Sequence, residues 1–156
     1  YNAAISACEL AGQRVSAKRL LAAAISSDLY STLWEENTFN LRNLSAPVAR
    51  TAVRLALDDV VRRPSKRRFH DVRKGDDFAI ITGQGNHGDG AEAVVRPAIL
   101  AMLRDEFGEL VECREDVQIP GLLVVPAESL RDWIHRERQR RRERKQRRTS
   151  SESRND

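Results

Sequence analysis

The chain of 156 residues has room for one compact domain with additional segments, and not for two large domains. Charged residues make up 32% of it and aromatic residues only 5%, so its core must be mainly aliphatic. No apolar run approaches the length of a membrane span, which excludes a transmembrane helix. Cys8 and Cys113 lack the paired spacing of a zinc site or a disulfide framework, which favours a reducing compartment and no structural metal.

The N-terminal third is predicted to begin with helices and to continue as a strand. Residues 1–27 carry two short helical patterns that break near Gly12. Residues 28–37 show little pattern and are predicted to be a linker. From Phe39 the pattern changes to alternation of apolar and polar side chains, which predicts a short strand over 38–44.

The next helix is predicted from its N-terminal signals and its apolar stripe. Ser45 suits the N-cap, and the following segment places Arg50, Arg54 and Asp58 opposite its apolar face. Pro64 is expected to end this helix. The pairs Asp58–Asp59 and Asp76–Asp77 are expected to solvate helix and strand ends and not to bind a metal.

The remaining patterns predict, in order, a strand at 76–82, a helix from about 95 to Gly108, strands at 110–117 and 122–125, and a helix from Pro126. From Phe39 the order is then β-α-β-α-β-β-α. This order predicts an α/β fold, a two-layer sandwich with a mixed four-stranded sheet over residues 38–126. A helical hairpin precedes the sandwich and a basic helix, 127–148, follows it; residues 149–156 are expected to be disordered.

A glycine-rich loop follows the strand at 76–82. Four of the eight glycines lie in the segment Gly83-Gln84-Gly85-Asn86-His87-Gly88-Asp89-Gly90. Such a turn lets the backbone approach a ligand and directs free N–H groups toward an anion, above all a phosphate. The spacing also matches a dinucleotide fingerprint, but a β-α unit already precedes it and too little chain follows to complete that fold. A plain flexible connection is the alternative to a binding role.

The loop and its flanking segments resemble the small MutS-related (Smr) domain. The resemblance lies in Thr82-Gly83-Gln84-Gly85-Asn86-His87-Gly88, Val95-Arg96-Pro97-Ala98-Ile99 and Pro120-Gly121-Leu122-Leu123-Val124-Val125, and covers about residues 38–126. It implies a β-α-β-α-β-β sandwich that binds nucleic acid and, in several members of the family, cuts it endonucleolytically.

The first segment resembles a pentatricopeptide repeat, an RNA-reading helical hairpin. The resemblance lies in Tyr1-Asn2-Ala3-Ala4-Ile5-Ser6-Ala7-Cys8-Glu9-Leu10-Ala11-Gly12 and Ala17-Lys18-Arg19-Leu20-Leu21. Asn2 falls where that family places a base-selecting residue, and is equally suited to a helix start. The combination resembles the pentatricopeptide-repeat–Smr proteins, which act on organellar RNA. We therefore expect the C-terminal piece of a longer organellar protein, with any targeting region upstream.

The chain departs from the nuclease motif of the Smr family. The resemblance implies Leu-Asp-x-His on the first strand, where this chain has Asn40 and Arg42. Asn cannot accept a proton, and Arg stays protonated near neutral pH, so neither is a general base. Arg42 can still pair with a phosphate. His87 is then the candidate catalytic residue of an active endonuclease, for which a divalent metal is a candidate cofactor; no other cofactor is expected.

Two basic segments suggest a polyanionic partner. Residues 136–148 carry nine basic and two acidic side chains, whereas residues 1–135 carry 17 basic and 19 acidic ones. A smaller basic cluster spans 62–74 and is expected to be an exposed loop. Arginine-rich segments bind RNA through its phosphates. A nuclear-import signal and a merely solvated charged helix are the alternatives for the tail.

Three hypotheses follow for the function. The first is an RNA-binding module, with DNA as the alternative ligand and no membrane partner. The second is an endonuclease for RNA or DNA, and the third is a protein-interaction domain with a solvated tail. The residues predicted to contact nucleic acid are Asn2, Arg42, Thr82, Gly83, Gln84, Gly85, Asn86, His87, Arg140, Arg141, Arg142, Arg144 and Lys145.

Overall fold

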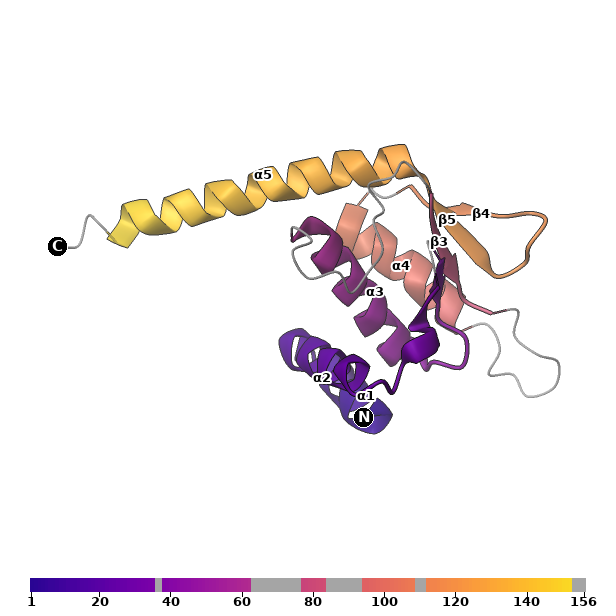
Figure 1. Ribbon diagram of the computed structural model, residues 1–156. Coiled ribbons are helices and arrows are strands. Elements are labelled where there is room, and N and C mark those ends of the chain that lie inside the picture. The colour runs from indigo at the N-terminus through magenta and orange to yellow at the C-terminus, as the bar shows by residue number, and fades with distance from the viewer. Residues whose placement is uncertain (36–37, 63–76, 84–93, 109–111, 153–156) are drawn as a thin grey trace.

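The computed structural model describes residues 1–35, 38–62, 77–83, 94–108 and 112–152 (Figure 1). It begins with a hairpin of α1 (Asn2–Leu10) and α2 (Arg14–Ser26), which confirms the two helices predicted from the sequence. Gly12 lies between them with φ +73°, a left-handed conformation that favours glycine. A 3₁₀ turn, η1 (Ser31–Leu33), leads from the hairpin to the sheet.

One sheet of mixed direction forms the centre of the α/β fold, as the sequence predicted. Its strands are β1 (Trp34–Glu35), β2 (Thr38–Asn40), β3 (Phe78–Ile81), β4 (Arg114–Glu115) and β5 (Leu122–Val125), in the order β1-β2-β3-β5-β4. The pair β2–β3 is parallel and the other three pairs are antiparallel.

The outermost strand, β1, lies inside the segment that was predicted to be a linker. It forms because Trp34 packs against two aromatic residues of the sheet, with ring centroids 5.5 Å from Phe39 and 5.7 Å from Phe78. Trp34 is the partner of Phe39 in the β1–β2 register, so the two rings lie on one face. The described part of 28–37 is therefore joined to the sheet.

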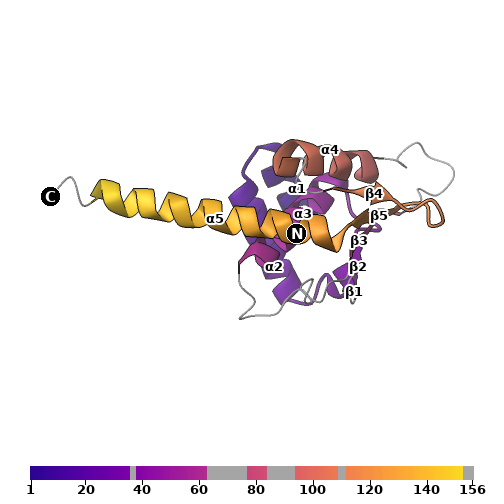
Figure 2. The same cartoon turned by 90° about the horizontal axis from the view of Figure 1, so that it is seen from above.

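The helices lie on one side of the sheet (Figures 1 and 2). They are the hairpin α1–α2, α3 (Ala46–Val61), α4 (Val95–Phe107) and α5 (Ala127–Glu152). Alternate strand residues point toward them and are buried: Phe39, Phe78, Ile80, Leu123 and Val125. The residues between them on these strands are half-buried, the pattern of a sheet with one covered face.

Several element ends differ from the prediction. Among the described residues of the strand predicted over 110–117, only Arg114–Glu115 form a strand, because the chain turns at Asp116, whose carboxylate accepts two backbone N–H groups. The strand predicted over 38–44 ends at Asn40, because the chain turns at Asn43, which has φ 63°. At the C-terminus, α5 continues to Glu152 instead of ending at 148, where the disordered segment was predicted to begin. No Gly or Pro interrupts this stretch, and the hydroxyl of Ser150 donates to the carbonyl of Gln146, 2.9 Å away, inside the helix. Residues 153–156 lie outside the described residues.

A buried ion network joins the hairpin to the α/β body. The polar face predicted for α3 does not face solvent, since α1 and α2 cover it. Arg54 donates to both carboxylate oxygens of Glu106 on α4, at 2.6 Å each, and to Glu9 on α1 at 2.5 Å. The side chains of Arg54 and Glu9 are only 8% and 3% exposed. Charge-assisted bonds of this kind hold α1, α3 and α4 at fixed positions relative to one another.

The same network shifts the protonation equilibria of its members. Burial would raise the pKa of Glu106, but the hydrogen bond and the charge of Arg54 outweigh it and hold that pKa below its ordinary value. Burial would lower the pKa of Arg54, and its bonds to Glu106 and Glu9 raise it instead. Glu106 and Arg54 are therefore both charged in the folded protein at neutral pH.

Candidate nucleic-acid interface

Three connections meet at one edge of the sheet, where the parallel strands β2 and β3 both end. The N–H of Leu41 donates to the carbonyl of Ile81 at 2.8 Å. The N–H and hydroxyl of Thr82 both donate to the carbonyl of Gly121, at 2.8 and 2.9 Å. The carboxyl ends of parallel strands are the usual place of ligand sites in open α/β sheets. We call this group of residues, 40–44, 82–83 and 116–121, the sheet edge.

Arg42 and Gly83 lie side by side at the sheet edge. The amide oxygen of Asn40 accepts the N–H of Arg42 at 3.1 Å, a local turn that holds the Arg42 backbone while its side chain is exposed. A Cβ placed on Gly83 would lie 3.7 Å from Cγ of Arg42, which is ordinary contact, so space does not require the glycine. Its φ of +86° does. The structure thus brings together two residues of the predicted set.

Thr82 was predicted to contact a phosphate. In the structure it supports the backbone at this edge. Its side chain is buried and its hydroxyl is bonded to Gly121. It positions the turn at Gly83 and does not face solvent. Gln84, Gly85, Asn86 and His87 lie outside the described residues, as do His70 and residues 63–74 of the middle basic cluster.

Asn2, the predicted base-selecting residue, contacts Tyr30. The Tyr30 hydroxyl donates to the amide oxygen of Asn2, the first residue of α1. This bond ties the start of the hairpin to the segment that follows it. This bond uses one of the two lone pairs of the amide oxygen, so an Asn2 that read a base would use its amide nitrogen or the second lone pair.

The first half of α5 is anchored on the body by apolar packing and a capped N-terminus. Leu130, Trp133 and Ile134 are buried, and the Trp133 ring meets Phe107 of α4 edge-on at 5.6 Å. The carboxylate of Asp77 accepts the N–H of Ala127 at 2.9 Å, which satisfies a free donor at the helix start. Asp77 was predicted to solvate the end of a helix or strand. In the structure it caps the N-terminus of α5.

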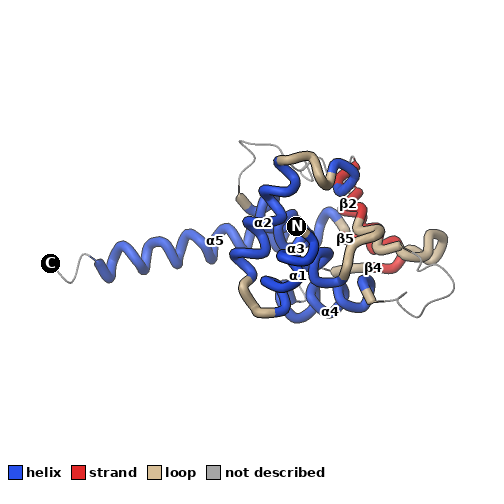
Figure 3. Tube along the Cα trace, turned by 90° about the horizontal axis from the view of Figure 1, so that it is seen from below, coloured by secondary structure: helices blue, strands red, loops and turns tan. Residues whose placement is uncertain are grey.

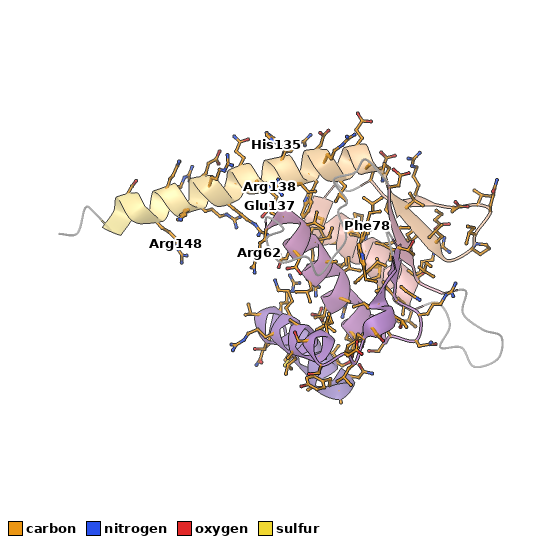
Figure 4. The ribbon with its side chains drawn as sticks, viewed as in Figure 1. Arg62, Phe78, His135, Glu137, Arg138 and Arg148 are labelled. Atoms are coloured by element: carbon orange, nitrogen blue, oxygen red, sulfur yellow. The ribbon has the colours of Figure 1, made fainter. Side chains whose placement is uncertain are left out.

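Two arginines fix the direction of α5 against the end of α3. Arg138 donates to the carbonyls of Val61 and Val60, at 2.9 and 3.3 Å, where α3 ends. Arg141 donates to Asp58 of α3 at 2.9 Å and to Glu137 at 3.1 Å. Figure 4 shows Glu137 and Arg138 beside the end of α3, where Arg62 is labelled. Arg141, which was predicted to contact nucleic acid, is engaged by Asp58 and Glu137 in the structure and holds the helix.

Asp58 is the point where three helices meet. It accepts from Lys18 of α2 as well as from Arg141 of α5. Burial would raise the pKa of Asp58, but the hydrogen bonds from Lys18 and Arg141 hold it below its ordinary value. The two Asp58 contacts join residues 40 and 83 positions apart, so no local pattern in the sequence could have revealed them.

Alongside this anchor and beyond it, α5 carries a row of exposed arginines. Arg136, Arg140, Arg144 and Arg147 follow one another at intervals of four, four and three residues, which places them on one flank of the helix. Arg142 and Lys145 are also exposed. The predicted set omitted Arg136 and Arg147, although their spacing from Arg140 is a signal that the sequence contains. We call the four residues the arginine row.

The described residues of the predicted set therefore lie in three separate places: Asn2 on α1, the sheet edge, and α5. The sheet edge lies after β3, at Thr82, whereas α5 starts at the other end of that strand, where Asp77 caps it. Figures 1 and 3 show the free end of α5 on the side of the molecule away from the β4–β5 connection. The arginine row and the sheet edge are therefore two separate candidate regions and not one.

Membrane and metal signals are absent from the described part of the chain. None of its helices is both long and apolar enough to cross a bilayer. Within the same described residues, no three His, Cys, Asp or Glu side chains lie close enough to hold a metal ion together. Comparisons with protein-family models, with curated proteins and with solved structures found no match to this chain.

Proposed function

We propose that this protein binds nucleic acid, with RNA as its ligand, through phosphate contacts made by the arginine row of α5. The observation that carries the proposal is the row itself: four exposed guanidinium groups on one flank of a helix whose first half is anchored on the body. At 1.5 Å per residue, successive members are about 4.5–6 Å apart. Guanidinium groups pair well with phosphate oxygens, and each contact releases condensed counterions.

The anchoring of α5 supports binding because it fixes the row before the ligand arrives. An arginine-rich peptide that folds only on binding loses conformational entropy at that step. Here the buried Leu130, Trp133 and Ile134, together with Arg138 and Arg141, hold the helix against α3 and α4. The exposed side chains still lose rotamer freedom, but the backbone does not.

The sheet edge is the second contact region in this proposal. Arg42 is exposed there beside Gly83, at the ends of two parallel strands. We assign residues 38–126 to the Smr type of sandwich, with β-α-β-α-β-β order, and the hairpin before it to a single pentatricopeptide-like repeat. The sequence resemblance supports this assignment and is also the reason for choosing RNA, in an organelle, over DNA.

A triple substitution in the arginine row tests the proposal. Arg140→Ala/Arg144→Ala/Arg147→Ala removes three contacts from a stretch that alanine keeps helical. Its affinity for a labelled single-stranded RNA should fall at least tenfold at 100 mM salt. The matched control, Arg19→Ala/Arg104→Ala/Arg131→Ala, removes the same charge from exposed sites outside the row. It should stay within about threefold of the wild type.

Equal losses in the two triple variants would contradict a site on α5, because they would show an effect of net charge alone. Circular dichroism of both variants checks that the helix content is kept. If the wild type does not bind RNA, the protein-interaction hypothesis is the one that remains. If the wild type cleaves the RNA and His87→Ala does not, the endonuclease hypothesis replaces the binding hypothesis.

A further inference from the structure

The connection between β4 and β5 presents apolar side chains to solvent. Val117 is 95% exposed and Ile119 is 54% exposed. Figure 1 shows this connection extending away from the helices at the end of the sheet. Single exposed apolar side chains are common on proteins, so exposure alone implies nothing. Two in one short connection, next to a candidate ligand site, call for a physical reason.

The connection is held in one conformation by its own hydrogen bonds. The carboxylate of Asp116 accepts the N–H groups of Gln118 and Ile119, at 2.7 and 3.0 Å. The N–H of Leu122 donates to the carbonyl of Ile119 at 3.1 Å, and that of Asp116 donates to Leu122 at 3.2 Å. The side chains of Val117 and Ile119 therefore extend from a preorganised turn.

The same turn is bonded directly to the sheet edge. The carbonyl of Gly121, two residues after Ile119, accepts both donors of Thr82. Thr82 precedes Gly83, which lies against Arg42. The turn that carries the apolar pair is thus bonded to the residue before Gly83, which lies next to the exposed Arg42. Arg114, also exposed, lies just before the turn on β4.

The geometry points to Val117 and Ile119 as an apolar platform for unpaired bases of a single RNA strand whose phosphates lie at the sheet edge. The inference rests on the proposed function and names its substrate class. A base in a duplex has both faces covered by stacking, whereas an unpaired base offers a face to an apolar side chain. Gln118, exposed between the two, adds an amide for base edges.

The charges around the platform favour a nucleic acid over an acidic or apolar protein partner. Arg42 and Arg114 supply positive charge. Of the two carboxylates that follow Arg114, Glu115 is paired with Arg96 and Asp116 is engaged by two backbone N–H groups. A partner that combines flat apolar faces with regularly spaced negative charge matches this surface. Single-stranded RNA has both properties.

The test compares Val117→Ser/Ile119→Ser with Leu10→Ser/Val15→Ser, a control pair of exposed apolar residues on α1 and α2, on either side of the turn between them. Each protein is titrated with one labelled single-stranded RNA and with the same strand annealed into a duplex. The platform variant should bind the single strand about tenfold more weakly and the duplex within twofold of the wild type. Its salt dependence should not change, because no charge is removed. The control pair should bind like the wild type.

Two outcomes would overturn the platform. One is unchanged affinity of the Val117→Ser/Ile119→Ser protein for the single strand; the other is an equal loss for single strand and duplex. In either case, a loss in the arginine-row variant would show that the proposed function survives without the platform. If the arginine-row variant also binds like the wild type, the proposed function fails with it.

Discussion

At the scale of single residues, strand β2 and the turn after it show how a motif position can change its chemistry. Asn40 and Arg42 stand where the Smr resemblance implies a general acid–base pair, and the structure joins them by a hydrogen bond from the backbone of one to the side chain of the other. Asn40 shapes the turn and Arg42 presents a permanent positive charge. Both roles suit phosphate binding better than proton transfer.

Gly83 should be required for its backbone conformation. Gly83→Ala places a Cβ where there is room but where φ is +86°, so unfolding in urea should show a loss of about 1–2 kcal/mol. Gly83→Asn is the matched control, because asparagine tolerates the left-handed region better, and should lose less. An alanine variant as stable as the wild type would show that the turn adopts another backbone conformation without loss of stability.

Asp58 should make stability depend on pH in the acid range. Its pKa is held below the ordinary value in the folded state, so its contribution is present above the unfolded pKa of about 3.9 and is lost as pH falls through the folded pKa. Thermal melts from pH 7 to pH 2 should show a smaller fall in Tm below about pH 4 for Asp58→Asn than for the wild type. Asp132→Asn removes the same charge at an exposed position. A control curve identical to that of Asp58→Asn would contradict the role of the ion pairs.

How much of the candidate site could be predicted depended on whether the signal was local. Periodicity placed Arg140 and Arg144 on an exposed helix, and the glycine pattern placed Gly83 at a turn. The engagement of Arg141 by Asp58 and the burial of Thr82 depend on contacts with distant parts of the chain. No spacing within the sequence contains that information.

At the scale of elements, helix signals predicted the helices better than alternation predicted the strands. Apolar stripes repeat over several turns in α3 and α4, so the prediction averages many residues. Strands β1 and β4 have only two residues each, too few for a period to show. β1 depends instead on the packing of Trp34 against Phe39 and Phe78. The polar face of α3 was located correctly, but its cover by the hairpin could not be predicted.

The joint between hairpin and body should depend on Arg54. Arg54→Met leaves Glu9 buried with reduced compensation, since Arg50 remains 3.5 Å away. Breaking a buried ion pair by removing one partner costs about 3–5 kcal/mol, and we expect about 3 kcal/mol here in a denaturant titration. Arg50→Met, which removes a neighbouring guanidinium from the same face, should cost less than half as much. Equal losses of unfolding free energy in the two variants would show that either arginine compensates the charge of Glu9.

At the scale of the whole molecule, the two proposed contact regions are separated by the length of the sheet and by the anchored half of α5. The hairpin, α3, α4 and α5 are connected through Arg54 and Asp58, so the elements between the regions are held together. A single RNA that touches both regions must therefore be long enough to run across the molecule. A short RNA would occupy one region at a time, with the lower affinity of that region alone.

The measurement that tests the central claim most directly is the salt dependence of RNA affinity for the wild type and for Arg140→Ala/Arg144→Ala/Arg147→Ala. Each phosphate contact to a single strand contributes about −0.7 to the slope of log K against log salt concentration. The arginine row and Arg42 together predict a slope of about −3.5 for the wild type. The variant has three contacts fewer, so its slope should be shallower by about 2. The RNA should remain intact throughout. A wild-type slope near zero, or the same slope in both proteins, would contradict phosphate binding by α5.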